Sequence, residues 1–220
     1  MEEKKTEGLL LQAIPYLGHC KILKVLTTEE GIISLMARKK ALQSFTTPFL
    51  IAEWVYTIGK GEIHTLQDAS LCNDFADLRK EYAVISAAGL IAQDLLKSQY
   101  PEKKGNGPYA LAVAFFQKLP KCASQDALIA SFRLKLLLHD GLLGLQNECV
   151  HCGSPPLFLD DGGSCCQAHK KGYSIPFSTQ EWALLHHLTF ARQFLLLQNM
   201  SIEKSLQTKI EQLFYALTGR

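Results

Sequence analysis

The chain has 220 residues, of which 47% are hydrophobic and 20% are charged, with a formal net charge of +2. This length holds one large domain or two small ones, and the composition supports a buried core. No run of eighteen uncharged apolar residues occurs, which excludes an ordinary membrane-spanning helix, and an odd count of seven cysteines argues against a disulfide framework. The first five residues lack the apolar run of a signal peptide. We therefore expect a cytoplasmic protein with no membrane partner.

The first seventy residues predict short β-strands. Segments rich in Leu, Ile and Val come first, at 9–14, 21–27 and 31–37, with a turn signal at Glu29-Glu30-Gly31. A hairpin candidate follows, in which 49–57 and 62–66 are joined by Gly59-Lys60-Gly61. Five short strands with hairpin-like links are typical of a small closed barrel, and the OB-fold is the commonest one at this length.

Trp54 and Tyr56 share one face of the predicted fourth strand, because side chains alternate with period two. We assign that face to the core of the barrel. The alternative is an exposed platform on which nucleic-acid bases stack.

After about residue 71 the apolar period changes to 3.6, which predicts helices. The expected helices are 74–97, 109–118, 124–139, 179–198 and 201–218, and Ser178 with Glu181 forms a capping-box pattern before one of them. The predicted fold class is therefore α+β and multidomain. A five-stranded OB-fold β-barrel at 1–72 is followed by an α-helical domain at 73–220, which carries an inserted Cys/His zinc loop at about 146–175.

Two short ligand pairs make this loop the most informative part of the chain. Cys149 and Cys152 have the x₂ spacing that lets two thiolates reach one ion from a tight turn, and Cys166 with His169 repeats it. Four protein ligands leave no open coordination position, so the site is predicted to hold a structural Zn²⁺. Cys165 or His151 can replace a proposed ligand, and ordinary reduced cysteines are the alternative to a metal site.

No catalytic constellation is found in the sequence. The His-Glu-x-x-His, deaminase, P-loop and Gly-x-Ser-x-Gly patterns are all missing. The carboxylates show no pairing that the sequence supports. We expect a protein that is not an enzyme; a metal-dependent hydrolase or deaminase requires an open zinc site, with three protein ligands and a water.

Binding is better supported than catalysis. OB barrels commonly bind single-stranded nucleic acid with a positive groove and stacking aromatic rings. The candidate phosphate contacts are basic residues of the barrel: Lys21, Lys24, Arg38, Lys39, Lys40 and Lys60. The run 38–40 closes the third strand at the rim, where the alternative is a strand end kept soluble by charge.

Several segments, taken in order, resemble the bacterial RecO family of DNA recombination mediators. They are Glu7-Gly8-Leu9-Leu10-Leu11, Tyr16-Leu17-Gly18, residues 24–33, Ala37-Arg38-Lys39-Lys40, the apolar helix 131–137, and Cys149-x₂-Cys152 followed by Gly153. The resemblance spans about residues 7–175. His169 stands where zinc-binding members have a fourth cysteine, and the tail 202–220 lacks the expected pattern.

The resemblance implies a non-enzymatic role in DNA repair. Members of the family bind single- and double-stranded DNA, anneal complementary strands, contact the acidic C-terminal tail of single-strand-binding protein, and act with RecR to load RecA. A nucleoid-associated location follows. Basic residues beyond the barrel are candidates for the acidic peptide or for more DNA: Lys121, Arg133 and Lys135. The alternative is a zinc-stabilised adaptor that binds an acidic peptide and has no direct DNA role.

Overall fold

The computed structural model describes residues 2–38, 40–101 and 105–219, with the backbone alone at 40, 41 and 43. The chain divides into two compact units, Met1–Pro120 and Lys121–Arg220. The last barrel strand ends at Asn73, close to residue 71, where the sequence predicts the change to helices, and two α-helices that follow belong to the first unit. The predicted domain division at 72/73 and the bounds of the zinc insertion stay predictions.

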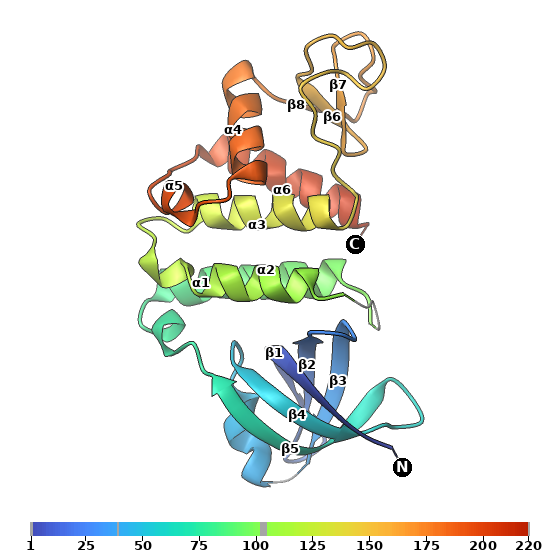
Figure 1. The fold of residues 1–220 in the computed structure, drawn as a ribbon, viewed down its shortest axis with the longest axis vertical. Helices are drawn as coiled ribbons and strands as arrows, with labels where there is room; N and C mark the ends of the chain where they lie inside the picture. The colour runs from blue at the N-terminus through green and yellow to red at the C-terminus, as the bar shows by residue number, and fades with distance from the viewer. Residues whose placement is uncertain (1, 39, 102–104, 220) are drawn as a thin grey trace. The chain divides into compact units, whose positions relative to one another are not determined.

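The first unit is a five-stranded barrel followed by helices (Figure 1). Its elements in chain order are β1 (Glu3–Tyr16), β2 (Cys20–Thr27), β3 (Ile32–Ala37), the 3₁₀ helix η1 (Lys40–Thr46), β4 (Ile51–Thr57), β5 (Ile63–Asn73), the 3₁₀ helix η2 (Ala76–Arg79), α1 (Tyr82–Ser98) and α2 (Gly107–Phe116). The 3₁₀ helix η3 (Leu119–Lys121) follows, and its last residue is the first of the second unit. The strands close in the order β1-β2-β3-β5-β4. Among the described strands of the barrel, β3 and β5 pair in parallel and the other pairs are antiparallel, and the predicted hairpin between β4 and β5 is confirmed.

The alternation of apolar side chains explains the barrel. On β2, Leu23 and Val25 point into the core, where Trp54 is also fully buried and its indole N–H donates to the Gly8 carbonyl at 2.9 Å. Tyr56 is buried as well. The shared face of the two aromatic residues is therefore core, as expected, and it is not a stacking platform.

The first strand is apolar on both faces. Leu10 lies in the barrel core, while Leu9 and Leu11 are buried although they fall outside that cluster. Helices α1 and α2 contact β1, and Tyr109 of α2 donates a hydrogen bond to Glu7 at 2.7 Å. The sequence of a strand that is covered on both faces is a continuous apolar run, because no position faces the solvent.

The turn between β2 and β3 is tied to two other strands through Glu30. Lys4 on β1 forms an ion pair with one carboxylate oxygen at 2.6 Å, and the Tyr56 hydroxyl donates to the other at 2.6 Å. Gly31, with φ +68°, supplies the left-handed conformation of the predicted turn. Burial opposes ionisation of Glu30, but the hydrogen bonds from Lys4 and Tyr56 outweigh it and lower the pKa of this carboxyl.

We expect Glu30→Gln to lower the free energy of unfolding of the barrel by about 1–2 kcal/mol at neutral pH, because hydrogen bonds to a charged group are lost. A carboxyl group whose pKa is lower in the folded state stabilises the fold at pH values above its unfolded-state pKa. This stabilisation disappears as the pH falls through the folded-state pKa. The difference between wild type and variant should therefore begin to shrink as the pH falls to the ordinary glutamate pKa of about 4.3, and should vanish below the lowered folded-state pKa. Denaturant unfolding, followed by Trp54 fluorescence in a Trp182→Phe background, measures the change in the free energy of unfolding. Glu53→Gln, which breaks the more exposed pair with Lys5, is the control and should cost less.

The second unit is built around one buried helix. Its elements are α3 (Asp126–His139), β6 (Phe158–Asp160), β7 (Gly163–Cys165), β8 (Ile175–Pro176), α4 (Thr179–Phe190), α5 (Phe194–Gln198) and α6 (Lys204–Thr218). Helix α3 contacts α4, α5 and α6 and is buried along most of its length. The capping box at the start of α4 is confirmed, since Ser178 and Glu181 bond each other's backbone N–H. The predicted fold class, a barrel followed by helices with a Cys/His cluster, is confirmed.

The prediction of one helix over 179–198 is wrong. Helix α4 ends at Phe190, and Ala191 leaves the helical region with ψ 121°. Two side chains of α3 bind the carbonyl groups at this end: the Ser131 hydroxyl donates to Leu188, and the Lys135 ammonium donates to Thr189 and Ala191 at 2.9 Å each. These donors satisfy carbonyl groups that a continuing helix would otherwise use.

Two further differences have local causes. Helix α1 begins at Tyr82 and not at residue 74, because Asp74 instead accepts the backbone N–H of Ala76 at the start of η2. The small sheet β7-β6-β8 was not predicted. Its β6–β7 hairpin turns at Asp161 and Gly162, which both have positive φ, as the common two-residue hairpin requires.

Within the described part of the chain, no helix combines the length and apolar character needed to cross a membrane.

Candidate metal centre and nucleic-acid interface

The four predicted ligands lie together in the second unit. Ligand atoms of Cys149, Cys152, Cys166 and His169 all fall within 4.8 Å of one another. The Cys152 and Cys166 sulfurs are 3.7 Å apart, and His169 Nδ1 lies 3.4 Å from the Cys166 sulfur. The structure therefore brings both predicted pairs to one point.

These separations fit a tetrahedral zinc site. Zn–S bonds of about 2.3 Å and Zn–N bonds of about 2.0 Å place two sulfurs about 3.8 Å apart and a sulfur about 3.5 Å from a nitrogen. The distance of 3.7 Å between the Cys149 sulfur and His169 Nδ1 agrees with the same geometry. The cluster can therefore hold a metal ion, and its thiolate and imidazole donors suit Zn²⁺.

The local backbone prepares the thiols for a cation. Burial opposes ionisation of Cys149, but backbone N–H groups of the turn outweigh it and lower the pKa of its thiol to about 6. The hydrogen bond between the Cys152 sulfur and the Ser154 side chain lowers the pKa of Cys152. The hydrogen bond with Cys149 raises the pKa of His169, whereas burial raises that of Cys166. Since a bound metal requires all four ligands deprotonated, metal binding releases protons.

Neither proposed substitute ligand belongs to this cluster. Cys165 is buried on β7, and its sulfur donates to the Cys166 carbonyl at 3.6 Å. The ring of His151 lies 5.2 Å from that of His169, centroid to centroid. The sequence analysis missed Ser154, whose hydroxyl contacts the Cys152 sulfur at 3.4 Å and whose carbonyl accepts the Cys149 N–H. Its position two residues after Cys152 was the available signal.

Lys21 and Lys24, two of the predicted phosphate contacts, lie on opposite faces of β2. Lys21 has the parity of the core residue Leu23, and its ammonium donates to the Thr46 hydroxyl of η1 at 2.8 Å. Lys24 lies on the outer face and donates to the Ser34 hydroxyl at 2.8 Å. The two lysines therefore do not form one patch.

The other predicted barrel contacts are at strand ends. Arg38 is exposed after β3, with its Nε–H directed to the Met36 sulfur at 3.0 Å. Lys60 is exposed in the link between β4 and β5. Lys39 lies outside the described residues, and so does the side chain of Lys40.

The three predicted partner-binding residues differ in accessibility. Lys121 is exposed. Arg133 is buried, with its guanidinium near the rings of Phe214 and Tyr215. Lys135 is half-buried and caps α4, and burial lowers the pKa of its ammonium. Arg133 and Lys135 thus have partners inside their own unit.

We expect Cys152→Ser to abolish bound zinc and to lower the unfolding midpoint of the second unit, because three remaining ligands bind the ion less tightly. Zinc per chain, measured by plasma mass spectrometry of protein purified without chelator, checks this. Cys72→Ser is the matched control, since that exposed thiol lies outside the cluster. Wild-type protein that retains no zinc would contradict the metal assignment.

We expect Lys135→Met to lower the free energy of unfolding by about 1–3 kcal/mol, because two carbonyl groups of α4 lose their donor. Chemical denaturation followed by helical circular dichroism measures the effect. Lys204→Met removes an exposed lysine from the same unit and should change stability by less than about 0.5 kcal/mol. Equal effects of the two changes would show that the cap contributes nothing.

Comparison with known proteins finds a family model and relatives that share one description. Residues 1–75 match the family model described as "Recombination protein O N terminal". The DNA repair protein RecO of Chlamydia trachomatis serovar D is 27% identical over 219 residues, which cover 94% of this chain and 89% of the relative. That of Bacillus velezensis is 30% identical over 194 residues, covering 82% and 75%. The RecO protein of Chlamydia pneumoniae is 27% identical over 195 residues, covering 85% and 77%. With similarity over both units and the predicted barrel in place, the chain belongs to the RecO family of DNA repair proteins.

Proposed function

We propose that this protein is a recombination mediator that binds single- and double-stranded DNA, anneals complementary strands, and helps to load RecA together with RecR. The observation that carries this proposal is the similarity to proteins named DNA repair protein RecO, which extends through both units. The closed barrel at the matched N-terminal region supports it, because barrels of this kind commonly bind nucleic acid.

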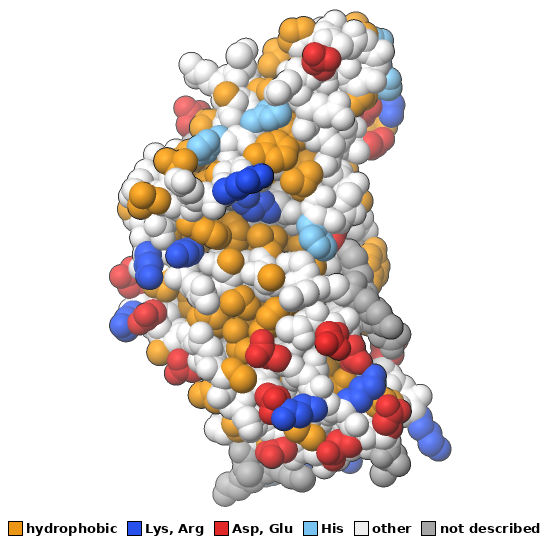
Figure 2. All heavy atoms as spheres, viewed as in Figure 1, with side chains coloured by type: hydrophobic (Ala, Val, Ile, Leu, Met, Phe, Trp, Pro, Cys, Tyr) orange, Lys and Arg blue, Asp and Glu red, His pale blue; other side chains and the backbone are white. Residues whose placement is uncertain are grey.

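A modest, distributed charge is compatible with annealing. The net charge is +2, and Figure 2 shows acidic and basic side chains interspersed on the visible face of the barrel. Annealing without chemistry requires that phosphate charge is neutralised while bases remain free to pair, which contacts of moderate affinity accomplish. The proposed contacts are those predicted from the sequence, with Arg38 and Lys60 the exposed members whose side chains are described.

The acidic tail of single-strand-binding protein is the proposed peptide partner. Lys121 is exposed beside a segment whose Ala123 N–H bonds the Gln198 carbonyl at the end of α5. Leu195 and Leu196 of α5 are exposed too, and Figure 2 shows basic side chains surrounded by apolar ones over the second unit. A peptide with acidic and apolar residues is complementary to such a surface. Arg133 and Lys135 bind groups inside the second unit. Their proposed role is therefore to stabilise this unit, and Lys121 is the basic residue that is exposed to the peptide.

The metal centre has a structural role in this proposal. Four protein ligands close a tetrahedral site, so no position remains for a substrate or a catalytic water. Zinc, when bound, holds the segment between α3 and α4 together. We accordingly propose a binding protein of the cytoplasm and not an enzyme.

We expect salt-sensitive binding to a fluorescently labelled single strand, measured by anisotropy. The logarithm of the binding constant should fall with the logarithm of salt concentration at about 0.7 per phosphate contact. Replacing Arg38, Lys39 and Lys40 together by alanine should weaken binding and reduce this slope by about 2, because three counterion-releasing contacts are lost.

The control for this triple change removes equal charge from the second unit: Lys170, Arg192 and Lys204 to alanine, all exposed residues. That variant should retain the wild-type slope. Wild-type protein that binds no strand even at low salt would overturn the DNA-binding role and favour the adaptor that binds an acidic peptide alone.

A further inference from the structure

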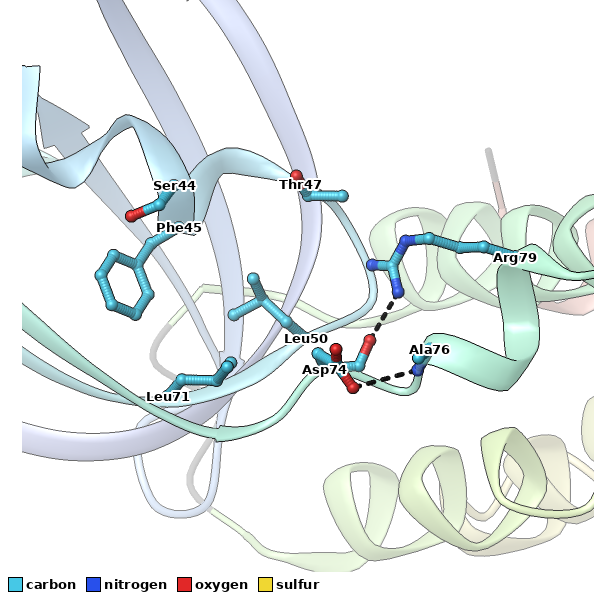
Figure 3. A pocket seen from close by; sticks show the side chains of 8 residues that line it. All are labelled: Ser44, Phe45, Thr47, Leu50, Leu71, Asp74, Ala76 and Arg79. Carbon is cyan, nitrogen blue, oxygen red and sulfur yellow. Dashed lines mark hydrogen bonds between the residues drawn. The ribbon is translucent and has the colours of Figure 1, made fainter.

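A pocket of about 480 Å³ opens in the first unit beside the barrel (Figure 3). It is lined by residues of η1, the end of β5 and η2: Ser44, Phe45, Thr47, Leu50, Leu71, Asp74, Ala76 and Arg79. In Figure 3, Phe45 and Leu71 lie on one side, Asp74 and Arg79 lie on the other, and Leu50 lies between them. Its volume falls within the range of small-molecule sites.

The apolar side of the pocket is rigid because it is an extension of the barrel core. Leu50 belongs to the buried core cluster, and Phe45 packs against that cluster. The ring of Phe45 meets Trp54 edge-on, with 6.5 Å between centroids. Leu71 adds an exposed apolar side chain on the same side as Phe45 (Figure 3). A flat, apolar occupant therefore finds a preformed surface.

The polar side carries one charge of each sign. The Arg79 guanidinium donates to the carbonyls of Asp74, Phe75 and Pro48, at 2.6, 3.4 and 2.7 Å. Since these acceptors are neutral, the guanidinium keeps its full positive charge at this side of the pocket. One carboxylate oxygen of Asp74 accepts the Ala76 N–H. The lining is formally neutral, so it suits a neutral ring with donors and acceptors better than a phosphate or an acidic peptide.

The pocket also adjoins a proposed phosphate contact. Lys21 donates to Thr46, and the residues on both sides of Thr46, Phe45 and Thr47, line the pocket. A DNA strand with a phosphate near Lys21 therefore lies close to the opening of the pocket, because Thr46, which binds Lys21, is the direct neighbour of two lining residues.

We infer that this pocket binds an unpaired base of single-stranded DNA. The base lies against Phe45 and Leu71, and its edge faces Asp74 and Arg79. This inference rests on the proposed DNA-binding function and deepens it, because it adds a site for the base to contacts with the phosphates. Stacking on a protein side chain is possible for every base, because every base has a flat π-face. A base that is paired within a duplex cannot enter the pocket.

The test compares a labelled oligodeoxyadenylate with an abasic strand of equal length and charge, by anisotropy at one salt concentration. The wild type should bind the strand with bases about fivefold more tightly or better, as stacking of one base provides. Phe45→Ala should bring this ratio close to one and leave the affinity for the abasic strand unchanged. Leu71→Ser, at an exposed position, should reduce the ratio without a cost in folding.

The matched control is Leu142→Ser, which makes the same change at an exposed leucine of the second unit and should preserve the ratio. Equal, salt-sensitive binding of both strands by the wild type would overturn the base pocket and leave the proposed function standing. Binding of neither strand would overturn the proposed function and the pocket with it. A synthetic peptide of aspartate and leucine residues that binds the wild type, fails to bind Leu71→Ser and does not compete with DNA would overturn the base pocket in favour of a peptide site.

Discussion

The double pairing of β1 is the constraint on which the first unit depends. Residues 3–9 of this strand pair with β4, and residues 8–16 pair with β2, so one strand contributes to two ladders and closes the barrel. A bulge between Leu10 and Gln12 lets the strand bend as it passes from one partner to the other. One face of β1 lies in the barrel core and its opposite face is buried as well. All three residues at 9–11 must therefore be apolar, and a sequence that alternates apolar with polar residues would not fit here.

That closure also positions the functional elements of the barrel. The β2–β3 turn is held through Glu30 by residues of β1 and β4, and the segment after β3 folds into η1 over the core. The proposed phosphate contacts at 38–40 and the aromatic ring of Phe45 therefore belong to one short segment. Its position is set by the packing of Phe45 beside Trp54.

Local patterns predicted most of the architecture, because the signals on which they depend are themselves local. The barrel strands follow from short segments rich in Leu, Ile and Val, the turn at Gly31 follows from its sequence, and the four metal ligands follow from x₂ spacing. The break after Phe190 had no such signal. It depends on donors of Ser131 and Lys135, which lie more than fifty residues away in sequence. The internal engagement of Arg133 likewise became visible only with the tertiary packing. The separation of Lys21 from Lys24, in contrast, follows from period-two alternation along the predicted strand, which the sequence analysis did not apply to them.

The metal cluster joins residues close in sequence, since its first and last ligands are Cys149 and His169. Closing a loop this short has a small entropic cost, and it needs no contact with a distant part of the chain. During synthesis, the ion can therefore be captured as soon as residue 169 has left the ribosome, before α4, α5 and α6 exist. When an ion is bound, this segment is then ordered before the helices that pack on α3 are complete.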